Sequence, residues 1–258
     1  MRTALVRRAV LTASAVSLSL LATACGSGDA DKKADDAKPS AGAAAPAASE
    51  APAAKGKTDA EVTALVVTQA DLPDQLVKPE GAAKAALVAA ESDNAACKPL
   101  VQVQSTAKIG TATGIGRTGT KAKPKELPAS ASAEEKIEAG LMAMGGAQTL
   151  VTVASYDGKG AAEAFAAVKA AGTACAAGYT VTSEGEKVKF NNVTPGAAVT
   201  GGDEAVSYTA DMDMDGGEKS TTHFVIVRKG NSLATFYTYG LKTELPKSVV
   251  DAQVKKLG

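Results

Sequence analysis

Aromatic residues are scarce in this chain of 258 residues, which has 4 Phe, 5 Tyr and no Trp. Its core must therefore be built largely from small aliphatic side chains. An excess of either charge is also missing, because 28 basic residues balance 28 acidic ones. Nucleic-acid binding requires a concentrated basic face, so we expect no nucleic-acid partner.

Sequence motifs for common chemistries are missing as well. The sequence contains no dinucleotide fingerprint, no Gly-x-Ser-x-Gly elbow and no Cys/His cluster with metal-ligand spacing. The glycine-rich stretch at residues 110–119 lacks the spacing and the Lys-Ser/Thr ending of a phosphate-binding loop. We therefore predict no cofactor and no enzymatic activity.

The single histidine, His223, lies in the strand-like stretch Thr-Thr-His-Phe-Val-Ile-Val. Strand alternation places it on one face with Val225 and Val227, and places Phe224 and Ile226 on the other face. Base catalysis would need a nucleophile within reach, and no motif supplies one. We expect His223 to be structural.

Residues 1–24 have the order of a secretory signal peptide: a basic start, an apolar run and three small residues. The apolar run, residues 9–21, is shorter than the roughly 20 residues that span a bilayer as a helix. Arg7 and Arg8 could belong to a twin-arginine export signal or to an ordinary basic start. The segment therefore predicts export, with the export route open.

Cys25 directly follows Ala22, Thr23 and Ala24, and a Gly-Ser-Gly stretch follows it. This arrangement resembles a lipobox, although the position that most often holds Leu is Ala22, with Leu21 one residue earlier. We predict a lipid on Cys25, whose two acyl chains anchor the protein to the outer face of the cytoplasmic membrane. The alternative is an ordinary signal peptide, with Cys25 incidental.

Residues 25–57 form the predicted tether. After Cys25 this segment has no Leu, Ile, Val or aromatic residue, so it cannot bury enough apolar surface to offset the entropy of ordering. We expect a disordered spacer that reaches ~30 Å as a flexible coil. It would hold a domain at residues 58–258 clear of the membrane.

The domain opens with helical signals. Thr58 and Glu61 match a capping box, and we expect the first helix to run from there to the turn at residues 71–74. A helix capped by Asp93 or Asn94 should carry Cys97. Three more helices are predicted from apolar spacing: 82–91, 161–177 and a final helix starting at Pro246.

Strand signals dominate the second half. The segment 109–120 is predicted as a weak strand or loop, 121–135 as an exposed loop, and 137–144 is open between helix and strand. Gly230 and Asn231 predict a hairpin turn. Clear strands are predicted at 149–156, 187–193, 205–212, 221–229 and 232–239. This order indicates an α+β fold, a single domain with an antiparallel sheet packed with helices.

With Cys25 lipidated, Cys97 and Cys175 remain. In an exported chain an even pair is most simply a disulfide, here between the early helical part and the long central helix. Two buried free thiols are the alternative.

The stretch from Asp211 resembles the opening of a calcium loop, with Asp213 and Asp215 at positions 3 and 5 and Gly216 at position 6. The Glu required at position 12 is replaced by Thr222. An acidic, solvated hairpin loop explains the same residues. These three aspartates are therefore a weak calcium candidate.

Several segments together point to a known family. They are residues 65–73, 154–156, 164–167, Cys175 and 227–231. This combination resembles actinobacterial lipoproteins with the extracellular sensor-like domain of PknH-type serine/threonine kinases, over about residues 58–258. The resemblance implies an α+β fold with a central antiparallel sheet, disulfides and a groove for an unknown ligand. It implies no catalytic residues.

We therefore expect a lipid-anchored, extracytoplasmic binding or sensor-like module. Its partners would be the membrane, through the anchor, and a small or lipidic ligand or an envelope protein. An exported enzyme acting on cell-envelope material is the alternative, and a structural envelope protein without a ligand is another.

Overall fold

The computed structural model describes residues 54–79, 90–124, 126–213 and 219–258, which belong to one compact unit. Cys25, the predicted signal peptide and most of the predicted tether lie outside these residues. The helices are α1 (Asp59–Leu65), α3 (Lys98–Gln104), α4 (Ala133–Gly145), α5 (Gly160–Ala174) and α6 (Lys247–Leu257), with a 3-10 turn η1 (Ala95–Cys97). None of these described helices is long and apolar enough to cross a membrane.

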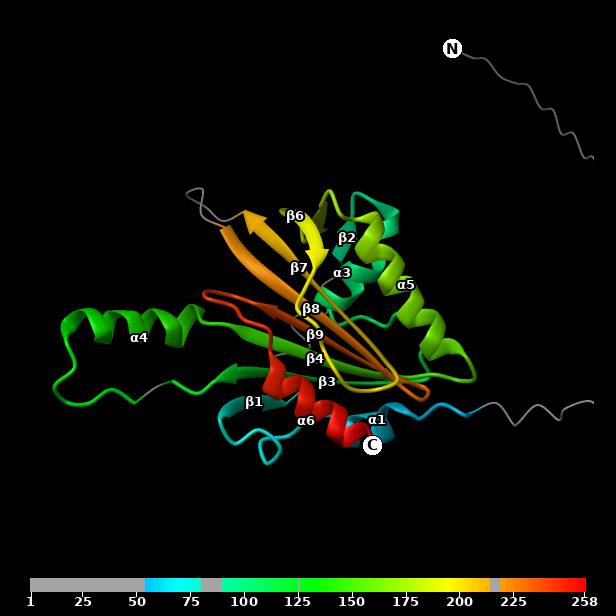
Figure 1. The fold of residues 1–258 in the computed structure, drawn as a ribbon, viewed down its shortest axis with the longest axis horizontal. Coiled ribbons are helices and arrows are strands. Elements are labelled where there is room, and N and C mark those ends of the chain that lie inside the picture. Colours follow the sequence, from blue (N-terminus) through cyan, green and yellow to red (C-terminus); the bar gives the residue numbers. More distant parts are fainter. Residues whose placement is uncertain (1–53, 80–89, 125, 214–218) are drawn as a thin grey trace, which may run out of the picture. The chain divides into compact units, whose positions relative to one another are not determined.

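The strands form one antiparallel sheet (Figure 1). Their order across the sheet is β1-β3-β4-β9-β8-β7-β6-β5-β2. The strand bounds are β1 (Gln75–Pro79), β2 (Ala90–Ser92), β3 (Gly114–Ala122), β4 (Gln148–Ser155), β5 (Tyr179–Ser183), β6 (Glu186–Pro195), β7 (Glu204–Asp213), β8 (Lys219–Lys229) and β9 (Ser232–Tyr239). The predicted α+β class is confirmed.

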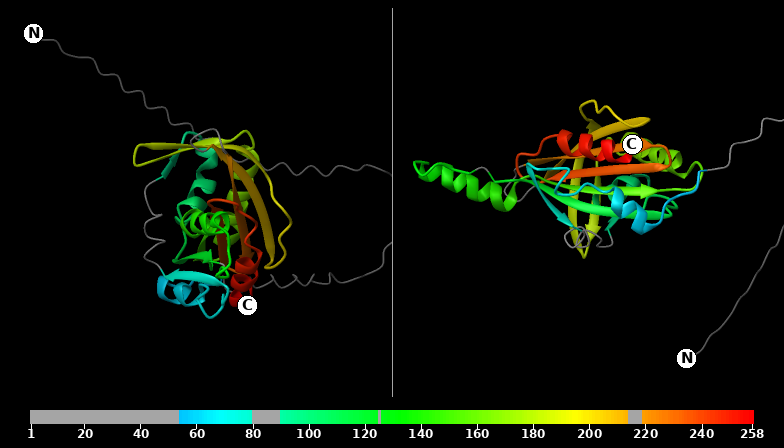
Figure 2. Two further views of the ribbon diagram at one scale, coloured as in Figure 1. Left: turned by 90° about the vertical axis from the view of Figure 1, so that its left-hand side faces the viewer. Right: turned by 90° about the horizontal axis from the view of Figure 1, so that it is seen from below.

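Helices cover both faces of the sheet (Figure 2). Helices α3 and α5 pack on one face, over a core that includes Phe165, Phe224 and Tyr237. Helices α1 and α6 pack on the other face, over a core that includes Val151 and Phe236. We call these the α3/α5 face and the α1/α6 face.

Helix α1 begins as predicted but ends early. Thr58 Oγ1 accepts a hydrogen bond from Glu61 N, and Thr58 N donates to Glu61 Oε2, which completes the capping box. The helix ends at Leu65 rather than at the turn that starts with Asp71. Val67 N instead donates to Oε1 of the buried Gln253 at 3.0 Å, so a tertiary contact replaces the next helical hydrogen bond.

The glycine-rich segment that looked like a weak strand or loop is the well-buried strand β3. A Cβ on Gly116 would lie 2.9 Å from Thr63 Cα and 2.7 Å from Val66 Cγ2. Glycine is therefore required for the close approach of α1 to the sheet. Local strand propensity could not reveal this contact.

Two other predicted segments differ in the structure. Residues 137–144, which the sequence left open, belong to α4, whose start is fixed by a capping box between Ser132 and Glu135. The predicted helix at 82–91 lies mostly outside the described residues, and its last two residues are in β2 instead. They pair with β5, a strand that the sequence did not predict.

Cys97 and Cys175 form the predicted disulfide, with an S–S distance of 2.05 Å. Both residues are buried. The bond joins η1 to the residue that ends α5, so it ties the helical layer of the α3/α5 face together.

The last residues of the predicted tether are already part of the folded unit. Gly56 N donates to Asp157 Oδ1 at 2.7 Å, and Lys57 N donates to Ser155 Oγ at 3.0 Å. The ordered chain therefore begins before Thr58.

Candidate ligand-binding site

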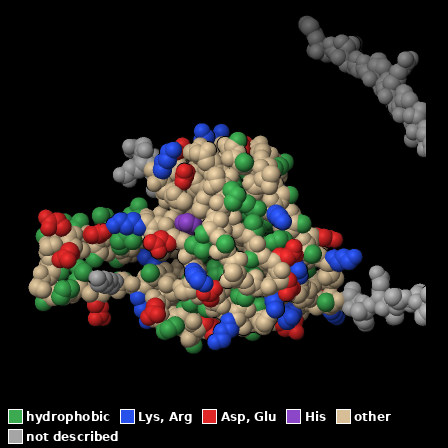
Figure 3. Space-filling model, in the orientation of Figure 1, with side chains coloured by type: hydrophobic (Ala, Val, Ile, Leu, Met, Phe, Trp, Pro, Cys, Tyr) green, Lys and Arg blue, Asp and Glu red, His purple; other side chains and the backbone are tan. Residues whose placement is uncertain are grey.

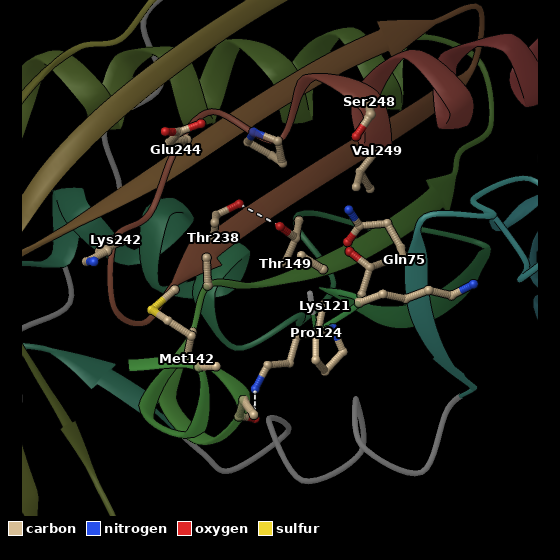
Figure 4. Close-up of a pocket in the computed structure, with 18 of the residues that line it drawn as sticks. Gln75, Lys121, Pro124, Met142, Thr149, Thr238, Lys242, Glu244, Ser248 and Val249 are labelled. Atoms are coloured by element: carbon tan, nitrogen blue, oxygen red, sulfur yellow. Dashed lines mark hydrogen bonds between the residues drawn. The ribbon is translucent and has the colours of Figure 1, made fainter. Parts of the chain in front are cut away.

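A pocket of about 690 Å³ lies where β3 leads into α4 and β9 leads toward α6 (Figure 4). Its wall is made by α4, the ends of three strands, Gln75 of β1 and the start of α6. This volume is within the range of small-molecule sites, roughly 300–1,000 Å³. The connections that form the wall are far apart in the sequence.

A row of polar side chains forms the floor of the pocket. Thr120, Thr149 and Thr238 are neighbours on adjacent strands, and all three line the pocket. The Thr149 and Thr238 hydroxyls are hydrogen-bonded at 2.8 Å (Figure 4). The buried Thr120 Oγ1 has no hydrogen-bond partner among the described residues. The row continues to His223 and Thr209 on the next two strands.

Two lysines, one on β3 and one in the segment after β9, bind side-chain or backbone groups of α4. Lys121 Nζ donates to Ala143 O at 2.6 Å, close to the C-terminal end of α4, where a cation is favourable. Lys242 forms an ion pair with Glu138, and this contact lowers the pKa of that carboxyl. Helix α4 is therefore held in place on the pocket side.

The first turn of α6 forms the upper side of the pocket, where Ser248 and Val249 line it (Figure 4). The helix starts after Pro246, and among the described residues no side chain caps it. Lys247 N donates to Leu245 O at 2.7 Å, so the N–H groups of Ser248 and Val249 are the ones available for hydrogen bonding to a ligand.

The rest of the lining combines aliphatic and charged side chains. Among the described residues that line the pocket, none is aromatic. The aliphatic members include Leu127, Met142 and Leu245, and the charged ones are Lys121, Lys123, Glu135, Glu138, Lys242, Glu244 and Lys247. The pocket thus offers aliphatic contacts and hydrogen-bonding groups, and no ring for stacking.

His223 lies beside the pocket and is not among the residues that line it. As predicted, it shares the α1/α6 face with Val225 and Val227. Burial lowers its pKa, while a hydrogen bond to the Thr243 backbone and the charge of Glu244 oppose that shift. Its Nε2 is buried with no partner among the described residues. Figure 3 shows it at the surface near the base of α4.

The calcium candidate is only partly described. Asp211 and Asp213 lie on β7, and Asp215 is outside the described residues. Asp211 Oδ1 accepts a hydrogen bond from Thr221 Oγ1 at 2.9 Å. Within the described part of the chain, no group of three potential ligands could hold a metal ion. Calcium binding therefore stays a prediction.

The resemblance implied a groove, but the position and lining of the pocket were not foreseen from the sequence. Its threonines come from three strands that are distant in the chain, and no local motif marks them. The capping box at Ser132 is one signal that would have placed α4 correctly. A helix predicted there would have shown that a long segment with its own helix, and not a tight turn, connects β3 to β4.

The fold and the pocket define an α+β domain with a candidate small-molecule site at one end of its sheet. No protein-family model matches the sequence, and no curated protein matches it. The structure is similar to the extracellular domain of PknH from Mycobacterium tuberculosis, with 10% identity and a TM-score of 0.47, over 79% of this chain and 96% of that one. This distant likeness carries no argument about function.

Proposed function

We propose that this chain is a lipid-anchored, extracytoplasmic binding protein that takes a small amphipathic ligand into the pocket between α4, the sheet and α6. The observation that carries this proposal is the lining, where a row of threonines faces aliphatic side chains in about 690 Å³. The ligand would be held without catalysis.

The lining suggests how such a ligand would bind. An aliphatic part would contact Met142, Leu245 and Val249. A polar head would accept hydrogen bonds from the threonine row and from the first turn of α6. Because aromatic side chains are missing among the described lining residues, a ligand that depends on ring stacking fits less well.

The location rests on the sequence and on the disulfide. The signal-like residues 1–24 and the lipobox-like surroundings of Cys25 support export and anchoring. The disulfide between Cys97 and Cys175 fits an oxidising compartment outside the cytoplasm.

A binding role is preferred to an enzymatic one because two of the three acids that line the pocket are already engaged. Glu138 pairs with Lys242, and Glu135 accepts a hydrogen bond from the Ser132 backbone. His223 lies outside the lining. A purely structural envelope protein would have no need of a pocket of this size.

Native mass spectrometry of the purified protein tests the binding proposal. We expect a co-purifying adduct, and saturable binding of the amphipathic probe 1-anilinonaphthalene-8-sulfonate that palmitate displaces. Ala139→Trp, which fills the pocket from α4, should weaken probe binding at least about tenfold. Ala166→Trp, at an exposed position of α5, is the matched control and should change nothing. No adduct and equal probe binding by both variants would refute the proposed site.

The anchor is tested separately by the intact mass of the mature protein. We expect a chain that starts at Cys25 and carries added diacylglycerol mass. Cys25→Ser should release the protein from the membrane fraction. A mature Cys25 without lipid would remove the anchor and leave the binding proposal standing.

A further inference from the structure

The first turn of α6 presents two hydrogen-bond donors to the pocket. The N–H groups of Ser248 and Val249 have no acceptor among the described residues, and that turn carries no acidic side chain. Both residues line the pocket, above Thr149 in Figure 4. The helix has 11 residues, so its N-terminal end carries a partial positive charge. Such a turn favours an anionic group on the ligand.

A further donor, independent of α6, lies on the sheet. Thr120 is 3% exposed, and its Oγ1 has no hydrogen-bond partner among the described residues. It is paired in register with Thr149, and both line the pocket. The Thr149 hydroxyl is already bonded to Thr238. Because a buried hydroxyl without a partner is uncommon and costly, a ligand oxygen would supply what Thr120 lacks.

The acceptors of the pocket wall are largely used within the protein. Glu135 accepts a hydrogen bond from the Ser132 backbone, and Glu138 pairs with Lys242. Glu244 is the remaining acid of the described lining, and it is exposed. A cationic head would therefore find a carboxylate only at the surface. An anionic head would find donors on α6 and on the sheet.

We propose that the polar head of the ligand is a carboxylate, which accepts hydrogen bonds from the Ser248 and Val249 N–H groups and from the Thr120 hydroxyl. This inference rests on the proposed function and adds the charge of the ligand to it. The side chains of Met142 and Leu245 remain for an aliphatic tail. The class of ligand is thus an aliphatic carboxylic acid in its ionised form.

Three ligands with the same ten-carbon chain and different heads test the charge. The Cys25→Ser protein keeps the rest of the chain and has no acyl chains of its own that could enter the pocket. After removal of bound lipid, calorimetry measures its affinity for decanoate, 1-decanol and decyltrimethylammonium. We expect decanoate to bind at least about tenfold more tightly than the other two, since charge-assisted hydrogen bonds are the stronger ones.

The outcomes separate this inference from the proposed function. Equal affinity for the three ligands, or tightest binding of the cation, would overturn the carboxylate and leave a binding pocket in place. Binding of none of them would refute both the pocket and its ligand class.

Ser248→Asp tests the α6 end of the site. Its carboxylate would occupy the first-turn N–H groups and repel an anion, while an acid in the first turn stabilises a helix. Decanoate affinity should fall at least about tenfold, and 1-decanol affinity should change less than about twofold. Ala162→Asp adds the same charge to the first turn of α5, at an exposed position outside the pocket, and is the matched control. Equal decanoate binding by the two variants would overturn the α6 site.

Thr120→Val tests the donor on the sheet. Valine keeps the shape and removes a hydroxyl that has no partner, so the ligand-free protein should be no less stable to urea. Decanoate affinity should still fall at least about fivefold. Thr152→Val is the matched control, because Thr152 is also buried and unpartnered among the described residues but does not line the pocket. The same decanoate affinity in both variants would contradict a role for Thr120.

Discussion

The two faces of the sheet are built from different side chains. Of the 4 Phe and 5 Tyr, all except Phe236 belong to the core of the α3/α5 face or pack against it. The disulfide joins the helical layer of that face. The α1/α6 face is built largely from valines. Large rings and the disulfide fill the space between the sheet and the helices on the α3/α5 face. The smaller side chains of the α1/α6 face leave room for a pocket at its end.

Ring contacts show how tightly the α3/α5 face is packed. Phe224 and Tyr237 have ring centroids 5.1 Å apart, and Tyr179 stacks on Phe190 at 5.3 Å. Burial raises the pKa of Tyr156, whose hydroxyl donates to the Ile109 carbonyl at 2.9 Å. The buried Tyr156 hydroxyl thus has a hydrogen-bond partner within this core.

The strongest test of this comparison truncates one buried ring on each face. Phe224→Ala and Phe236→Ala should each cost about 3–5 kcal/mol, since both side chains are fully buried. Phe224→Ala should cost about 1 kcal/mol more, because it also removes the ring contact with Tyr237. Urea unfolding measures both. An equal or larger loss for Phe236→Ala would break the comparison.

Removing the disulfide should have the next largest effect. The bond closes a loop with a sequence separation of 78, so a Cys97→Ala, Cys175→Ala double variant should lose about 2–5 kcal/mol. Hydrogen exchange should rise first in η1, α3 and α5, with α6 less affected. The oxidised wild-type protein is the reference. Loss of protection centred on α6 would contradict the assignment of the bond to one face.

On the α1/α6 face, Gln253 should be the most sensitive polar residue. Its amide is buried and bonds to Val67 N at 3.0 Å and to Leu65 O at 2.8 Å. Gln253→Leu leaves both backbone groups unpaired, and we expect a loss of about 1–3 kcal/mol. Thermal unfolding measures the loss, with Gln253→Glu as a second variant that keeps one acceptor. Wild-type stability in the leucine variant would show that water satisfies these groups.

The smallest expected effect is a pH dependence from His223. Burial lowers its folded-state pKa below the usual 6.5, so the unfolded chain takes up the proton first as the pH falls. The usual histidine pKa of about 6.5 lies between pH 5.5 and pH 8. The free energy of unfolding should therefore be lower at about pH 5.5 than at about pH 8. Thermal unfolding of wild type and His223→Asn measures this. A variant with the same pH profile as wild type would exclude His223 as the cause.

Elements with strong local signals could be predicted from the sequence. The capping box at Thr58, the disulfide partners and the hairpin at Gly230 are each fixed by a few neighbouring residues or by residue type. Strands β4, β7, β8 and β9 were found because alternation and β-branched residues extend over many positions.

Elements that depend on distant partners were missed or predicted only weakly. Strand β3 looks weak because its glycines serve contact with α1, and the end of α1 is set by Gln253, far along the chain. Strand β5 is short and gains its stability from β2 and β6 on its two sides. Local propensity is a weak guide where packing decides.

The sequence by itself determined the α+β class, the cysteine pair and the position of most strands, because periodicity and residue chemistry are local properties. Only the tertiary structure brought Thr120, Thr149 and Thr238 together, since their adjacency depends on the pairing of three separate strands. It also turned one side of α4 to the pocket and left the other exposed. The pocket is a property of this arrangement, which no single segment encodes.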